Sequence, residues 1–129
     1  MHLGKKILLV DDDRAMKYLT RIELERVNAQ CAIAEVSNGL EAIEVLESGL
    51  IQPDVIFLDL EMPKMNGYEF LREYQRKQLH LMGIKLYVLT TLANEFNEDE
   101  LMDQGIVSGV FDKPLNANHI LKLYNDFNS

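Results

Sequence analysis

Short apolar runs alternate along this chain with longer stretches whose apolar residues recur every three or four positions. The apolar runs cover residues 6–10, 31–36, 54–58, 86–89 and 110–111, and they lack the polar alternation of a half-exposed strand. Stretches of helical period follow them at about 14–27, after 37, after 67, weakly at 94–104, and after 116. Five such alternations predict a doubly wound α/β fold with a five-stranded parallel sheet and right-handed crossovers.

The local pattern also predicts which helix faces point inward and where the helices begin. Ser37 is a suitable N-cap for the second helix, and Asn116 or Asn118 for the last. The predicted inward positions are Met16, Leu19, Ile22 and Arg26 or Val27 in the first helix, Ala42, Ile43, Leu46 and Leu50 in the second, Tyr68, Leu71 and Tyr74 in the third, and Ile120, Leu123, Tyr124 and Phe127 in the last.

Polar residues follow the apolar runs immediately. In a parallel α/β sheet, ligands bind beyond the carboxyl ends of the strands, so these residues are the candidate site. They are Asp11, Asp12 and Asp13 after the first strand, Asp59 and Glu61 after the third, Thr90 and Thr91 after the fourth, and Lys113 after the fifth. We expect Asp13 to cap the first helix and the others to converge.

The chemistry of this set indicates a magnesium-dependent phosphoryl site. Carboxylate oxygens suit Mg²⁺, and His2, His80 and His119 are expected at the surface rather than in a cluster for a softer metal. Beside a bound cation, a carboxylate can attack phosphorus and form an acyl phosphate. Asp59 is the predicted acceptor because it ends the most apolar strand. A threonine hydroxyl and the Lys113 ammonium would neutralise the phosphoryl oxygens.

These residues resemble the receiver domain of two-component response regulators, with a match over nearly the whole chain. The matching segments are Asp11-Asp12 after Ile7–Val10, the run Asp59–Gly67, Thr90 after Leu86–Leu89, and Lys113-Pro114. The resemblance implies a flavodoxin-like (βα)5 fold with strand order 2-1-3-4-5. It also implies a single receiver domain over residues 1–129.

The resemblance further implies roles for single residues. Asp59 would accept a phosphoryl group from a sensor histidine kinase or a histidine phosphotransfer protein. Mg²⁺ would be held by Asp12 directly, by Asp11 through water, by Asp59, and by the backbone carbonyl of Glu61. Lys113 would pair with a phosphoryl oxygen, with a cis bond to Pro114, and Thr90 would move toward the phosphoryl group. That movement would alter partner contacts on the surface of the fourth helix, fifth strand and fifth helix.

Two positions depart from the family pattern. The family commonly has an aromatic residue three positions before the lysine, where this chain has Val110 followed by Phe111. The interval from Thr90 to Lys113 is one residue longer than usual. Either the loop at 92–97 carries an insertion or Thr91 supplies the hydroxyl, and we favour Thr90.

Three functions compete at this point. The first is a stand-alone phosphoacceptor switch, not an enzyme beyond its own phosphotransfer and autodephosphorylation, which signals to an unknown downstream protein. The second is a degenerate receiver that binds partners without phosphorylation. The third is a Mg²⁺-dependent aspartyl phosphohydrolase, which would carry Asp where this chain has Glu61.

Composition limits the class of partner and the compartment. The formal net charge of -8 argues against a nucleic-acid or anionic-lipid surface, which would need clustered lysine and arginine. The lone Cys31 excludes an internal disulfide and fits a reducing cytoplasm. No apolar run is long enough to span a membrane. We expect a cytoplasmic monomer or weak dimer.

Overall fold

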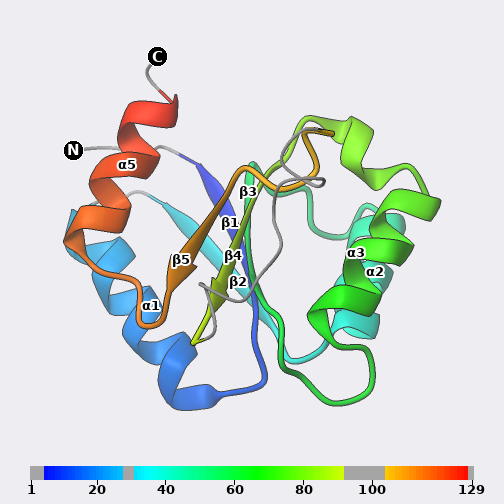
Figure 1. Cartoon of the computed structure of the whole chain (residues 1–129), viewed down its shortest axis with the longest axis horizontal. Coiled ribbons are helices and arrows are strands. Elements are labelled where there is room, and N and C mark those ends of the chain that lie inside the picture. Colours follow the sequence, from blue (N-terminus) through cyan, green and yellow to red (C-terminus); the bar gives the residue numbers. More distant parts are fainter. Residues whose placement is uncertain (1–4, 28–30, 92–103, 128–129) are drawn as a thin grey trace.

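The structure, a computed structural model, describes residues 5–27, 31–91 and 104–127. Within them, five strands form one parallel sheet (Figure 1): β1 (Lys6–Val10), β2 (Ala32–Val36), β3 (Val55–Asp59), β4 (Lys85–Thr90) and β5 (Gly109–Asp112). The strand order is β2-β1-β3-β4-β5. The doubly wound α/β prediction and the order implied by the resemblance are therefore confirmed.

Helices cover both faces of the sheet. The described helices are α1 (Arg14–Val27), α2 (Gly39–Glu47), α3 (Gly67–Arg76), the short 3₁₀ helix η1 (Leu79–Met82) and α5 (Ala117–Phe127). Figure 1 shows α1 and α5 on one side of the sheet and α2 and α3 on the other. None of these helices is long and apolar enough to cross a membrane. The weak helix predicted at 94–104 lies outside the described residues except for its last position.

The two faces of the sheet pack into separate apolar clusters. Leu8, Ile56 and Val88 pack toward α2 and α3, whereas Ile7, Phe57 and Tyr87 pack toward α1 and α5. Because both faces are covered, the central strands have no solvent-facing side, and every residue of β3 is buried. Asp59 is thus carried to the end of a strand that lies entirely inside the protein.

The predicted inward face of α1 is wrong. The residues that α1 buries are Lys17, Thr20 and Leu24, whereas Leu19 is 46% exposed and Met16 and Ile22 are only partly buried. Lys17, Thr20 and Leu24 have the spacing of one helical stripe. Two of the three are polar, and hydrophobic periodicity therefore could not identify the stripe.

Helix boundaries explain the other errors of local prediction. The N-cap of α2 is Asn38 rather than Ser37, and its side chain accepts a hydrogen bond from Glu41 N. Since α2 ends at Glu47, Leu50 falls beyond the helix and is 78% exposed. Tyr68 in the first turn of α3 was predicted to point inward but is exposed, and Phe70 is buried in its place.

The N-cap of the last helix is Asn116, one of the two residues predicted for that position. The Asn116 side chain accepts a hydrogen bond from His119 N, and Asn116 N donates to His119 Nδ1. His119 also stacks on Phe111, with ring centroids 4.6 Å apart, so it is half-buried instead of lying free at the surface. His80 is half-buried as well, while His2 and the side chain of Phe127 lie outside the described residues.

Candidate functional site

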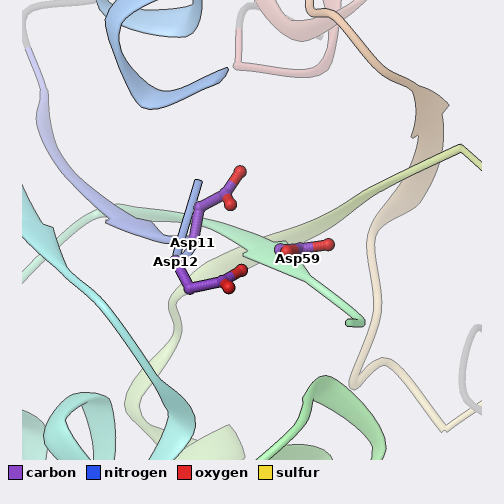
Figure 2. A group of neighbouring side chains, drawn as sticks. All are labelled: Asp11, Asp12 and Asp59. Atoms are coloured by element: carbon purple, nitrogen blue, oxygen red, sulfur yellow. The ribbon is translucent and has the colours of Figure 1, made fainter. Parts of the chain in front are cut away.

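The carboxylates of Asp11, Asp12 and Asp59 meet at the carboxyl edge of the sheet. Asp11 and Asp12 follow β1, Asp59 is the last residue of β3, and Val10 pairs with Leu58 in the neighbouring strand. One carboxylate oxygen from each of the three lies within 4.8 Å of the others (Figure 2). Parallel pairing of β1 with β3 thus brings together acids that are almost fifty positions apart.

Lys113 bridges two of these acids. Its Nζ lies 3.0 Å from Asp11 Oδ2 and 3.1 Å from Asp59 Oδ1, and all three side chains are almost fully buried. The backbone fixes this position, because Lys113 N donates a hydrogen bond to the Thr90 carbonyl at the end of β4. The Lys113–Pro114 peptide bond is cis, as expected.

The site holds more negative than positive charge. Burial, and then the nearby Asp11 charge, raise the pKa of Asp59 to about 6, while Lys113 and the Glu61 N–H oppose the shift. Burial alone would lower the pKa of Lys113, but its contacts with Asp11 and then Asp59 raise it. An additional cation would therefore be bound favourably beside Asp59.

The acids present the donor set that Mg²⁺ prefers. All three offer hard carboxylate oxygens, and neither histidine nor cysteine belongs to the group. Asp13 has another role, because its Oδ1 accepts a hydrogen bond from Met16 N at the start of α1. This contact is the helix cap expected of Asp13. The residues fit a magnesium ion held by Asp11, Asp12 and Asp59.

The loop that follows Asp59 is held closely against α3. Glu61 N donates to Asp59 Oδ1 at 3.2 Å, and Gly67 N donates to the Leu60 carbonyl at 3.0 Å. A Cβ at Gly67 would lie 2.5 Å from Leu60 Cα and 2.7 Å from the Asp59 carbonyl oxygen. Asn66 caps α3 in a reciprocal pair with Glu69. The Asn66-Gly67 dipeptide therefore positions the phosphoacceptor candidate.

An open cleft of about 210 Å³ gives access to Asp59. It is lined by Asp12, Asp13, Met16, Asp59, Glu61, Thr91 and Lys113. The two candidate threonines lie differently: Thr90 is 1% exposed at the end of β4, whereas Thr91 is exposed and lines the cleft. Glu61 is exposed on the cleft wall, two residues after Asp59.

One residue near the acids was not identified from the sequence. Lys17 is buried on α1, and it lines a small cavity that Asp11 and Asp59 also line. In the sequence, only the spacing of Lys17, Thr20 and Leu24 indicates that they share one helix face, and a hydrophobicity pattern does not detect this spacing.

Comparison with known proteins adds information about the family and the fold. The model of the response regulator receiver domain matches residues 7–125. The chain is 25% identical to the chemotaxis protein CheY of Thermotoga maritima, with coverage of 95% of this chain and 97% of that protein. It is 32% identical to the transcriptional regulatory protein YdfI of Bacillus subtilis over 81% of this chain, but spans only 44% of YdfI.

The first curated relatives are longer than this chain, which spans less than half of their length. Among solved structures, the response regulator TrrA of Thermotoga maritima, described in complex with Mg²⁺ and BeF, has a TM-score of 0.72. TrrA is 24% identical, and the alignment covers 95% of this chain and 98% of TrrA. This likeness shows a shared fold.

Proposed function

Because this chain belongs to the response regulator receiver domain family, we propose that Asp59 is the phosphoacceptor of a phosphorylation switch. The observation that carries the proposal is the position of Asp59, buried at the end of β3 beside Asp11, Asp12 and Lys113. Receiver domains are phosphoacceptor switches rather than classical enzymes. They interact with histidine kinases and phosphotransfer proteins, and we propose a phosphohistidine of such a protein as the donor.

In the proposed reaction, an Asp59 carboxylate oxygen attacks the phosphorus of the phosphohistidine. The P–N bond breaks as the P–O bond forms, the electron pair leaves with the imidazole nitrogen, and that nitrogen takes up a proton. The Asp59 side chain changes from one negative charge to two. Lys113, already 3.1 Å from Asp59 Oδ1, is positioned to pair with a phosphoryl oxygen.

Receiver domains bind Mg²⁺ in an acidic pocket, and a Mg²⁺ ion here would neutralise charge that develops on the phosphoryl oxygens. We propose Asp11, Asp12 and Asp59 as its carboxylate ligands, which their mutual distance of 4.8 Å or less supports. The Glu61 backbone carbonyl is the fourth proposed protein ligand. The response regulator TrrA is described in complex with Mg²⁺ and BeF, which supports the proposed Mg²⁺ ion.

We propose Thr90 as the hydroxyl that responds to phosphorylation. Its carbonyl already accepts a hydrogen bond from Lys113 N, so a displacement of Thr90 would be transmitted directly to the end of β5. The proposed output surface comprises β5, α5 and the segment at 94–104. Residues 94–103 of that segment lie outside the described part of the chain.

The phosphohydrolase alternative is less well supported. Such an enzyme would carry Asp two residues after the nucleophile, as expected above. In this chain Glu61 occupies that position and is exposed on the cleft wall. A degenerate, phosphorylation-independent receiver is also disfavoured, because the acids and Lys113 are in contact.

Incubation with acetyl phosphate and Mg²⁺, followed by intact mass measurement, tests the proposal. We expect one phosphoryl group on the wild type and none on Asp59→Asn. The matched control is Asp54→Asn, which removes an exposed acid next to the opposite end of the same strand and should label like the wild type. Persistent labelling of Asp59→Asn would exclude Asp59. Continuous release of phosphate over many equivalents would favour the hydrolase.

A further inference from the structure

Lys17 is a buried lysine with little local compensation for its charge. It is 7% exposed on the inward stripe of α1, a burial that lysine almost never reaches without a partner. Within the described residues, the one hydrogen bond of its side chain is from Nζ to Ser37 Oγ at 3.3 Å. A hydroxyl does not neutralise an ammonium, so other groups must compensate for this charge.

The acid site lies directly beside Lys17. Lys17, Asp11 and Asp59 line the same cavity of about 10 Å³, together with residues at the carboxyl ends of β1 and β3. Ser37, which anchors the ammonium, follows Val36, whose carbonyl accepts a hydrogen bond from Asp11 N at 3.2 Å. Lys17 thus lines a cavity next to Asp11 and Asp59, and it is not among the residues that line the open cleft.

The charges at the proposed phosphorylated site suggest what Lys17 does. This step rests on the function proposed for Asp59. Asp11, Asp12 and a doubly charged Asp59 acyl phosphate would carry four negative charges. Mg²⁺ and Lys113 would supply three positive charges. The unphosphorylated site with Mg²⁺ and Lys113 is already balanced, so the additional positive charge is required only after phosphorylation.

We propose that Lys17 is the residue that balances the charge added by phosphorylation. Its ammonium favours the phosphorylated form of the site and opposes Mg²⁺ binding to the unphosphorylated form. Because Lys17 acts through space in a region of low dielectric constant, it requires no direct contact with the phosphoryl group.

The test compares two ligands in Lys17→Met, which keeps most of the side-chain volume and removes the charge. Mg²⁺ affinity is measured by calorimetry, and beryllium fluoride affinity is measured at saturating Mg²⁺, since the bound fluoride adduct adds negative charge as a phosphoryl group does. We expect Lys17→Met to bind Mg²⁺ about twofold to tenfold more tightly and beryllium fluoride more weakly by a similar factor. The two shifts have opposite signs.

Three variants complete the test. Lys17→Arg keeps the charge and should restore both affinities. Ser37→Ala removes the hydrogen bond but keeps the ammonium, and should leave the ratio of the two affinities as in the wild type. Lys17→Gln, which also lacks the charge, gives the same readout if Lys17→Met does not fold.

Other outcomes overturn the inference. Equal weakening of both ligands would mean that Lys17 only packs against the core, and two unchanged affinities would mean that its charge is not felt at the site. The wild type separates these failures from failure of the proposed function. If the wild type binds neither Mg²⁺ nor beryllium fluoride, the function assigned to Asp59 is wrong.

Discussion

The Lys113 ammonium lies 3.1 Å from Asp59 Oδ1. Lys113 follows β5, an edge strand of the sheet, whereas Asp59 ends the central strand β3. Without that ammonium, Asp59 would face Asp11 across a buried space with no cation between them. With the Lys113 ammonium present, Asp11 and Asp59 together still carry one more negative charge than it neutralises, because both carboxylates share it. The site is therefore held together by one ammonium and remains ready to accept a further cation.

The first prediction concerns the stability of the metal-free protein. The pKa of Asp59 rises from 3.8 to about 6 in the folded state, mainly through burial and then through Asp11. Between these values the folded protein binds more protons than the unfolded chain, so the free energy of unfolding falls as pH rises through this window. We expect Asp59→Asn to be more stable than the wild type by about 1–3 kcal/mol at pH 7 without Mg²⁺.

Chemical denaturation from pH 4 to pH 7 measures this effect. The pH slope between about 4 and 6 should be smaller in Asp59→Asn than in the wild type. Glu44→Gln is the control, because Glu44 is exposed on α2 and its neutralisation should leave the slope unchanged. Equal slopes in Asp59→Asn and the wild type would contradict the prediction.

The second prediction concerns Lys113→Ala. Removing the ammonium leaves Asp11 and Asp59 buried together, so we expect a loss of about 2–4 kcal/mol in the free energy of unfolding without Mg²⁺. Mg²⁺ should still bind, with equal or higher affinity, because the lysine no longer competes for the same oxygens. Phosphorylation should no longer change the affinity for a partner.

Calorimetric titration with Mg²⁺ and denaturation with and without Mg²⁺ check this prediction. Lys85→Ala, at an exposed lysine on the other end of the sheet, should behave as the wild type in both. Loss of Mg²⁺ binding in Lys113→Ala, or an intact partner response, would show that Lys113 has a different role.

The third prediction compares two glycines: Gly67 has no space for a side chain, whereas Gly83 has a positive φ. Gly67→Ala places a Cβ 2.5 Å from Leu60 Cα, a backbone atom that cannot move without displacing the Asp59 loop. Gly83→Ala meets no atom within 4 Å and is strained only by its φ of +79°. We expect a loss of about 1 kcal/mol for Gly83→Ala and a clearly larger loss for Gly67→Ala.

Phosphorylation separates the two variants further. Gly67→Ala should also slow the labelling of Asp59 by acetyl phosphate, because Asp59 and Leu60 are the residues that its Cβ would push. Gly83→Ala should label at the wild-type rate. Equal losses of stability and equal labelling rates would mean that the loop accommodates the added methyl group.

The fourth prediction distinguishes the two threonines. Thr90→Ala should leave labelling of Asp59 intact and abolish the change in partner affinity, because the buried Thr90 is the proposed responding hydroxyl. Thr91→Ala removes a hydroxyl from the cleft wall and should retain the partner response. The measurement is partner binding with and without beryllium fluoride. The reverse pattern would assign the role to Thr91.

Prediction from the sequence succeeded where an apolar run identified a strand and the parallel topology then fixed which strand ends meet. The apolar runs before Asp11 and Asp59 identified two buried strands, and parallel pairing requires their carboxyl ends to meet. Helix faces were less predictable. For α1, the hydrophobic pattern favoured Leu19, whereas the structure buries Lys17 and Thr20. A helix next to a polar site can turn polar residues inward, and hydrophobicity then indicates the wrong side.

The sequence by itself determined the fold class, the strand order through its family resemblance, and the acids that the strand ends would present. Its apolar and polar positions suffice for this, because strand burial and parallel connection are set by composition and order along the chain. Only the tertiary structure decided that Lys113 bridges Asp11 and Asp59, and that Lys17 is buried beside them. Those contacts join segments from separate elements, and their distances depend on how the layers pack.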